Sequence, residues 1–256
     1  MIKAAFFDID GTLFSHTMHK IPDSARKAVH LLRENGVKVF LATGRGIRTL
    51  KKVSWGDLVF DGYITLNGQI CLDARENVLF EAPIKGEDAA YLIDAFQTKK
   101  LPLAIVEKNR TYLNFINETV RLAQESVAIP MLPIGEYKGA PIYQMIGYMT
   151  RKETENLAPK IPNCKITRWY EDGIDIISKD GGKDHGIRKI LEVHGFTREE
   201  SIAFGDSDND LEMLEFAGIG VAMGNAAESV KEAADYVTSH IDEDGIWNAC
   251  KHFELI

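Results

Sequence analysis

Short continuous runs of apolar residues alternate with amphipathic stretches over the first 68 residues of the chain. A buried parallel strand has such a continuous run, whereas a helix that packs on a sheet has apolar residues every three or four positions. The resulting order of strand, helix, strand, helix, strand favours a parallel sheet with right-handed crossovers. The predicted strands cover 2–7, 37–42 and 58–66, and the predicted helices cover 23–34 and a stretch through Leu50 and Val53.

Residues 82–180 have a different pattern, which follows a predicted hairpin of strands 69–72 and 78–81. Neighbouring apolar runs at hairpin spacing, separated by amphipathic helices, favour an α+β unit with a mainly antiparallel sheet. The predicted strands are 103–106, 111–115, 143–149, 165–169 and 173–177, and the predicted helices include one with Ala89, Leu92 and Phe96 on one face, 118–127 and 152–158.

The first pattern resumes after Asp180, with a helix that begins near Lys183 and a short strand at 201–204. A further helix and strand alternation continues toward the end of the chain. We therefore predict an α/β protein of two domains. The core domain comprises residues 1–81 and 181–256, and residues 82–180 form an inserted domain.

Composition narrows the class of protein. The net charge of −8 and the isoelectric point of about 5.4 argue against a general nucleic-acid binder or a protein that binds anionic membranes. No apolar run approaches the roughly 20 residues of a membrane span, and the apolar start of the chain is too short for a signal peptide. The three cysteines are widely spaced, which predicts reduced, buried or half-buried thiols in a cytoplasmic protein.

Polar side chains follow three of the predicted parallel strands. Asp8 and Asp10 follow the first strand, Thr43 follows the second, and Asp206 follows the strand at 201–204. These points share the edge at the carboxyl ends of the strands, where open parallel sheets bind ligands. Asp8 and Asp10 would project to the same side if the extended geometry continued. Alone, this first stretch is equally compatible with an ordinary Asp-Gly turn, so the other clusters decide in favour of a site.

The residue types in these clusters suit a phosphate ester and a hard divalent cation. Asp8, Asp206 and a partner such as Asp210 would offer oxygen ligands, and few carboxylates with room for water match Mg²⁺ better than Ca²⁺. Lys183 lies at the start of a predicted helix, where free N–H groups also favour an anion. A carboxylate can attack phosphorus and divide one displacement into two steps, while a second carboxyl group, such as Asp10, moves the proton.

The chain contains four motifs, which in order are Asp8-Ile9-Asp10-Gly11-Thr12-Leu13, Thr43-Gly44-Arg45, Lys183 and Gly205-Asp206-Ser207-Asp208-Asn209-Asp210. Together they resemble the motifs of the haloacid dehalogenase (HAD) superfamily. The long insertion between the second and third motifs is similar to that of the Cof-like phosphatases with a type-II (IIB) cap, and the resemblance covers the whole chain. It implies a Rossmann-like core, an inserted cap domain and Mg²⁺-dependent phosphoryl transfer.

The resemblance also implies a role for each motif residue. Asp8 would be the nucleophile and a metal ligand, and Asp10 would be the general acid/base and a ligand through its backbone carbonyl. Asp206 would bind Mg²⁺, and Asp210 would hold Lys183 or a metal-bound water. The residues implied in binding the substrate phosphate are Thr43, Gly44, Lys183 and Asn209.

Residues near the motifs have more ordinary interpretations. Arg45 is equally compatible with substrate binding and with capping the local structure. Asp208 is predicted to be a helix N-cap rather than a metal ligand. His16 and His19 are predicted to lie in a solvated loop rather than to bind a metal.

The sequence thus predicts a cytoplasmic, Mg²⁺-dependent phosphatase that acts on a small phosphorylated metabolite such as a sugar phosphate, with no nucleic-acid or membrane partner. One alternative is a phosphotransferase or phosphomutase, because an aspartyl-phosphate can also pass to an alcohol. Another is a non-catalytic sensor of a phosphorylated ligand. The acid at Asp10 favours an enzyme, because binding alone does not need a second acid beside the nucleophile. The sequence makes no prediction of the oligomeric state.

Overall fold

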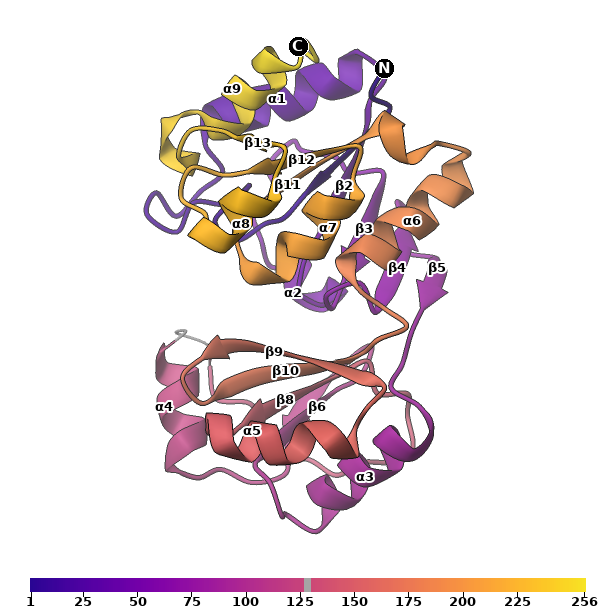
Figure 1. The fold of residues 1–256 in the computed structure, drawn as a ribbon, viewed down its shortest axis with the longest axis vertical. Coiled ribbons are helices and arrows are strands. Elements are labelled where there is room, and N and C mark those ends of the chain that lie inside the picture. Colours follow the sequence, from indigo (N-terminus) through magenta and orange to yellow (C-terminus); the bar gives the residue numbers. More distant parts are fainter. Residues whose placement is uncertain (127–129) are drawn as a thin grey trace. The chain divides into compact units, whose positions relative to one another are not determined.

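The computed structural model describes residues 1–126 and 130–256, which divide into two compact units (Figure 1). The core unit consists of Met1–Glu81 and Gly181–Ile256, and the inserted unit consists of Ala82–Asp180. The predicted α/β class, with a mainly parallel sheet and an α+β insertion, is confirmed. Among the helices of the described residues, none combines the length and the apolar composition needed to cross a membrane.

An eight-stranded sheet forms the centre of the core unit. Its strands, in spatial order, are β13 (Tyr236–Val237), β12 (Ile219–Ala222), β11 (Ser201–Gly205), β1 (Ala4–Phe7), β2 (Lys38–Ala42), β3 (Gly62–Thr65), β4 (Ile70–Asp73) and β5 (Val78–Glu81). The strands from β13 to β3 pair in parallel, and β4 and β5 continue the sheet with antiparallel pairing. All four residues of β1 are fully buried, as a central strand covered on both faces requires.

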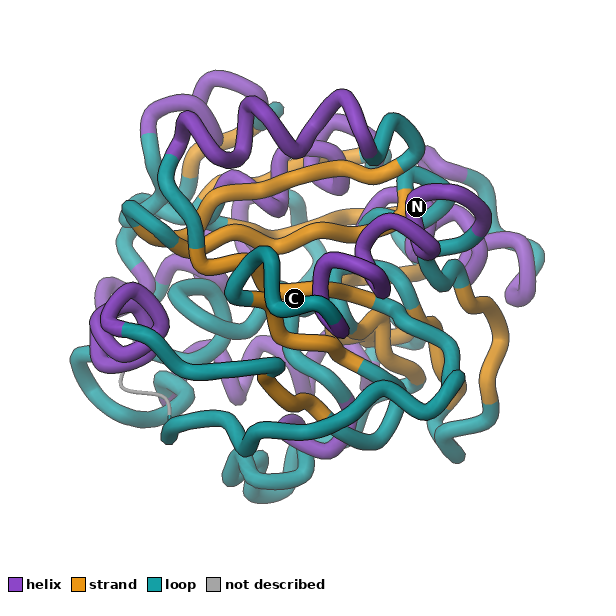
Figure 2. Tube along the Cα trace, turned by 90° about the horizontal axis from the view of Figure 1, so that it is seen from below, coloured by secondary structure: helices purple, strands orange, loops and turns teal. Residues whose placement is uncertain are grey.

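Helices cover both faces of this sheet, and Figure 2 distinguishes them from the strands by colour. One face packs against α1 (Asp23–Glu34) and α9 (Gly245–His252), and the other against α6 (Lys183–His194), α7 (Leu211–Phe216) and α8 (Glu228–Ala233). Neighbouring side chains of β1 pack on opposite faces of the sheet. Phe7 stacks on Phe204 in the first layer, and Phe6 stacks on Phe40 in the second, with ring centroids 4.6 and 5.0 Å apart.

Two core elements are shorter than their apolar runs predicted. The strand expected over 58–66 is regular only in β3, because the carboxylate of Asp61 accepts the N–H of Val39 and takes the place of a backbone partner. The helix expected to run through Val53 ends earlier, as α2 (Ile47–Leu50). The indole N–H of Trp55 donates to the carbonyl of Leu50 at 3.0 Å, so that a side chain takes an acceptor that a longer helix would use.

The inserted unit has a five-stranded antiparallel sheet. Its strands, in spatial order, are β7 (Thr111–Leu113), β6 (Leu103–Val106), β8 (Gln144–Tyr148), β10 (Gly173–Ser178) and β9 (Cys164–Tyr170), and its helices are α3 (Gly86–Gln97), α4 (Glu118–Ser126) and α5 (Arg151–Leu157). The helix predicted over 118–127 is α4, and residue 127 itself lies outside the described residues. Across the whole chain the three cysteines are buried and free, as predicted.

Candidate active site

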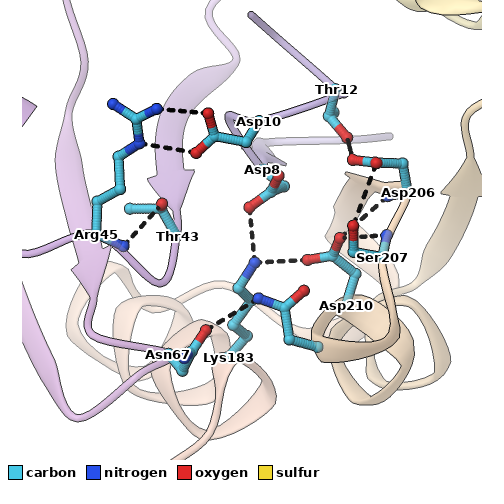
Figure 3. Close-up of polar contacts among 11 residues, drawn as sticks. Asp8, Asp10, Thr12, Thr43, Arg45, Asn67, Lys183, Asp206, Ser207 and Asp210 are labelled. Carbon is cyan, nitrogen blue, oxygen red and sulfur yellow. Dashed lines mark hydrogen bonds and ion pairs between the residues drawn. The ribbon is translucent and has the colours of Figure 1, made fainter. Parts of the chain in front are cut away.

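The carboxyl ends of three parallel strands lie next to one another at one edge of the core sheet. Because β1 pairs in parallel with β2 on one side and with β11 on the other, the residues that follow these strands converge. Asp8 follows β1, Thr43 follows β2 and Asp206 follows β11 (Figure 3). Lys183, the first residue of α6, extends its side chain into the same space.

Lys183 lies between two buried carboxylates. Its Nζ donates to Asp8 Oδ1 at 2.7 Å and to Asp210 Oδ1 at 2.6 Å, and the side chains of Lys183 and Asp210 are 1% and 0% exposed. Burial alone would lower the pKa of Lys183, but Asp210 and Asp8 outweigh it and raise that pKa above its usual value. The ammonium group is therefore held in its charged form, inside the protein and close to Asp8.

Three carboxylates in this space form a candidate metal site. Oxygen atoms of Asp8, Asp206 and Asp210 all lie within 4.8 Å of one another. Thr12 Oγ1 donates to Asp206 Oδ1 at 2.7 Å and fixes the orientation of that carboxylate. Gly11, which has a φ of +90°, is needed for this approach, because a Cβ atom there would lie 2.3 Å from Asp206 Oδ2.

The charges in this cluster fit a divalent cation. Three carboxylates and one ammonium leave two negative charges in a largely buried place. Burial raises the pKa of Asp8 well above its usual value, although Lys183 opposes the shift. Burial, with help from Asp210, also raises the pKa of Asp206 to about 6. A hard cation with oxygen ligands, such as Mg²⁺, would remove this excess charge.

The chain that follows β11 orients Asp210 through its own backbone. Asp210 Oδ2 accepts the N–H groups of Asp206 and Ser207, each at 3.0 Å, which leaves Oδ1 for Lys183. The prediction that Asp208 is the helix N-cap is wrong, because Ser207 occupies that position at the start of the 3₁₀ turn Asp208–Asp210. Asp208 is exposed and accepts a hydrogen bond from Ser229, so its carboxylate is not part of the buried cluster.

Asp10 lies in a different environment from Asp8. β1 ends at Phe7, so the extended geometry that would place both acids on one side does not continue. The carboxylate of Asp10 is not one of the three carboxylates of the candidate metal site. Arg45 binds it with two hydrogen bonds, from Nε at 2.7 Å and from Nη2 at 2.5 Å. The exposed His16 lies 3.2 Å from the same carboxylate. Arg45 therefore contacts the predicted acid/base directly, and metal binding through the backbone carbonyl of Asp10 stays a prediction.

The residues predicted to bind phosphate lie around Lys183. Thr43 is buried, and its Oγ1 accepts the N–H of Arg45 at 3.1 Å. Asn209 donates from Nδ2 to Asn67 Oδ1 at 3.0 Å. Gly44 lies against the side-chain amide of Asn67, because a Cβ atom on Gly44 would be 3.1 Å from Asn67 Oδ1.

The motifs in the sequence indicate no separate role for Thr12, and none of them includes Asn67. A signal for Asn67 was available, because it follows Leu66 just beyond the carboxyl end of β3, and β3 is parallel to β2. The rule that ligands bind at the carboxyl ends of parallel strands therefore applies to Asn67 as well.

Affinity of this site for Mg²⁺ is expected to fall as the pH is lowered through about 6, where Asp206 takes up a proton in the metal-free protein. A single competing proton weakens binding roughly tenfold per pH unit below the pKa, and the raised pKa of Asp8 would add to the effect. Titration calorimetry at pH 7.5 and pH 5, in buffers of different ionisation enthalpy, measures both the affinity and the protons released. An affinity that is independent of pH, with no proton release, would exclude Asp206 as a ligand.

Comparison with known proteins places the chain in a family. The model of the haloacid dehalogenase-like hydrolase family matches residues 5–250. The chain is 33% identical to the YkrA protein of Bacillus subtilis (strain 168), over 99% of this chain and 98% of that protein. A phosphatase of the HAD superfamily from Bacteroides thetaiotaomicron has a similar structure, with a TM-score of 0.93 and 30% identity over 100% of this chain and 96% of the other. A HAD subclass IIB sugar phosphatase has a TM-score of 0.86 and 39% identity, over 99% and 100% of the two chains. The chain therefore belongs to the haloacid dehalogenase-like hydrolase family.

Proposed function

We propose that this protein is a Mg²⁺-dependent phosphatase that hydrolyses the phosphate ester of a small metabolite through an aspartyl-phosphate on Asp8. The observation that carries the proposal is the buried cluster in which Lys183 contacts Asp8 and Asp210 beside Asp206. This cluster combines a carboxylate nucleophile, a fixed positive charge and a set of oxygen ligands. The names of the related phosphatases support the same class of reaction.

The residues present fit one Mg²⁺ ion. Asp8, Asp206 and Asp210 would hold it with carboxylate oxygens, and Asp10 would add its backbone carbonyl. When bound, Mg²⁺ would neutralise part of the negative charge on the transferring phosphoryl group. Lys183 supplies a second positive charge from the protein, and its two carboxylate partners keep it ionised at neutral pH.

Two displacements make up the reaction. In the first, an oxygen of the Asp8 carboxylate forms a bond to phosphorus as the bond to the leaving oxygen breaks, and Asp10 donates a proton to that oxygen. In the second, Asp10 takes a proton from water, the water oxygen attacks phosphorus, and the acyl-phosphate bond breaks. Asp8 is thereby regenerated and inorganic phosphate is released. Arg45 would hold the carboxylate of Asp10 in place between these steps.

Phosphate binding would use the groups around the nucleophile. Thr43, Lys183 and Asn209 would contact the phosphate oxygens, and Gly44 would let the backbone come close to them. Donors fixed in position before the substrate arrives need no reorganisation as charge moves in the transition state. This is the physical reason for burying Lys183 and Thr43 rather than leaving them in flexible, solvated positions.

We assign the choice of substrate to the inserted unit, acting as a cap domain. The leaving group would be a small metabolite, and a sugar phosphate is the first candidate, because one structural relative is a sugar phosphatase. Free buried cysteines support a cytoplasmic location. The partner we propose is therefore a soluble phosphorylated metabolite rather than a nucleic acid or a membrane.

We expect the protein to release inorganic phosphate from sugar phosphates and from p-nitrophenyl phosphate when Mg²⁺ is in excess and no acceptor is added. Removing the metal with EDTA should lower turnover by roughly 10³-fold, since a catalytic ion supplies several kcal/mol of transition-state stabilisation. Phosphate release is measured colorimetrically, and adding back Mg²⁺ is the control. Transfer that needs an alcohol acceptor would favour a phosphotransferase. Tight ligand binding without hydrolysis across the panel would favour a sensor.

A further inference from the structure

The turn between β3 and β4 has an unusual backbone. Three successive residues, Leu66, Asn67 and Gly68, have left-handed φ values of 53°, 54° and 84°. Asparagine and glycine tolerate this region, but a leucine there costs about 1–2 kcal/mol. An ordinary two-residue Asn-Gly hairpin does not need a left-handed leucine before it. Such strain persists only where the surroundings impose it, and it is often found at functional sites.

The surroundings of this turn are the loop that carries the predicted phosphate ligands. The N–H of Leu66 donates to the carbonyl of Arg45 at 3.1 Å, and the N–H of Asn67 donates to the carbonyl of Thr43 at 3.0 Å. Both N–H groups of this left-handed stretch therefore point toward the loop. The turn therefore fixes the backbone on each side of Gly44.

The side chain of Asn67 reaches a second motif. Its Oδ1 accepts from Asn209 Nδ2 at 3.0 Å, across 142 residues of sequence. Asn67 is only 7% exposed, although turn residues of this type are usually solvated. The turn also adjoins the loop before Lys183, because a Cβ atom on Gly68 would lie 1.8 Å from the carbonyl oxygen of Gly182. One short turn thus contacts three of the four motifs.

We propose that Asn67 is a positioning residue of the phosphate site. Its backbone holds the Thr43–Gly44 loop, and its amide oxygen fixes the side chain of Asn209 so that this amide is in place before phosphate binds. This inference rests on the proposed function, in which Asn209 contacts the phosphate. Groups held in the productive geometry avoid an ordering cost on binding, so losing the support weakens binding even when the contacting group is still present.

A double-mutant cycle tests the link between the two asparagines. Asn67→Gly retains the left-handed backbone and removes the amide, and it is expected to raise both KM for p-nitrophenyl phosphate and Ki for inorganic phosphate roughly tenfold, with kcat changed much less. Asn209→Ala should raise the same constants. Because Asn67 acts through Asn209, adding Asn67→Gly to Asn209→Ala should change little further. Effects that multiply in the double variant, or an unchanged KM and Ki in Asn67→Gly, would overturn the proposal.

Controls separate this role from a structural one. Glu76→Gly is the matched variant, since Glu76 is an exposed left-handed residue (φ 64°) in the next hairpin turn, and its KM and Ki should equal those of the wild type. If Asn67→Gly does not fold by circular dichroism, Asn67→Asp keeps an acceptor for Asn209. In the Asn67→Asp background, Asn209→Ala must still raise KM and Ki by the same factor as in the wild type. If Asn209→Ala no longer raises these constants there, the link between the two side chains is refuted.

The proposed function is tested separately, by Mg²⁺-dependent turnover of the wild type. If the wild type shows no turnover, the affinity for inorganic phosphate in the presence of Mg²⁺ replaces Ki in the same cycle. This affinity is measured by calorimetry. Weaker phosphate binding by Asn67→Gly than by the wild type would then support the positioning role alone. Equal phosphate binding by the two proteins would reject it.

Discussion

Replacing Asp8 by asparagine is expected to lower turnover of p-nitrophenyl phosphate by at least about 10⁴-fold, the size of loss seen when a covalent nucleophile is removed. The amide has the shape of the carboxylate but does not form the acyl-phosphate. One buried negative charge also disappears from a cluster that carries two in excess, and the raised pKa of Asp8 indicates that this charge is costly there. The metal-free variant is therefore expected to be at least as stable as the wild type, so that lost turnover reports lost chemistry.

Asp208→Asn is the matched control for this experiment. It makes the same substitution in a neighbouring loop, but Asp208 is exposed and its carboxylate contacts Ser229 rather than the buried cluster. Its turnover should remain within about twofold of the wild type, as expected for a surface substitution. Turnover is measured on highly purified protein, with thermal unfolding as the test of folding. Wild-type turnover by the Asp8→Asn protein would exclude Asp8 as the nucleophile.

Local patterns were enough to predict the elements that place Asp8. A fully buried parallel strand needs an uninterrupted apolar run, so the run at 2–7 identified β1, and the polar residue after it marked the carboxyl end of the sheet. Local patterns do not predict the spatial order of the strands, because β11 pairs with β1 although about 190 residues separate them. Hydrophobic periodicity carries no such long-range information. The motif order supplied it here, since the resemblance implied that Asp206 would join Asp8.

The contacts of Asp10 and Asn67 could not be predicted for a geometric reason. The bond between Asp10 and Arg45 depends on where the chain leaves the extended conformation after β1, and a change of one residue there reverses the direction of a side chain. Asn67-Gly68 has the composition of an ordinary turn, and its role depends on contacts with Thr43 and Asn209. The N-cap at Ser207 rather than Asp208 likewise differs by a single position between two residues of equal capping tendency.

Lys183→Met is expected to destabilise the metal-free protein by about 3–5 kcal/mol at neutral pH, the usual cost of removing one partner of a buried ion pair. Methionine fills a similar volume, so the cost comes from charge rather than from a cavity. The carboxylates of Asp8, Asp206 and Asp210 would lie within 4.8 Å of one another with no positive charge among them. Turnover should also fall by roughly 10³-fold, since one preorganised electrostatic contact with the reacting group is lost.

The pH dependence of this loss follows from the same charges. In the wild type, a Lys183 pKa raised above its unfolded value contributes stability that is fully present below the unfolded pKa near 10, so this contribution is constant between pH 5 and pH 8. In the variant, Asp8 and Asp206 lose the positive charge that opposes the rise of their pKa values, so their folded pKa values rise further above the unfolded value. Carboxyl groups of this kind stabilise the fold when protonated, and that stability is lost as the pH rises through the folded pKa. Lys183→Met should therefore be more destabilising at pH 8 than at pH 5.

Urea unfolding in EDTA at the two pH values measures this difference. Lys189→Met is the matched control, because Lys189 lies on the same helix but makes a surface ion pair with Glu192 at 2.7 Å, and its loss should cost no more than about 1 kcal/mol at either pH. Excess Mg²⁺ should recover part of the stability of Lys183→Met, because the cation replaces some of the missing positive charge. A loss of the same size at pH 5 and pH 8, unaffected by Mg²⁺, would mean that packing around α6, and not the charge of Lys183, holds this part of the fold together.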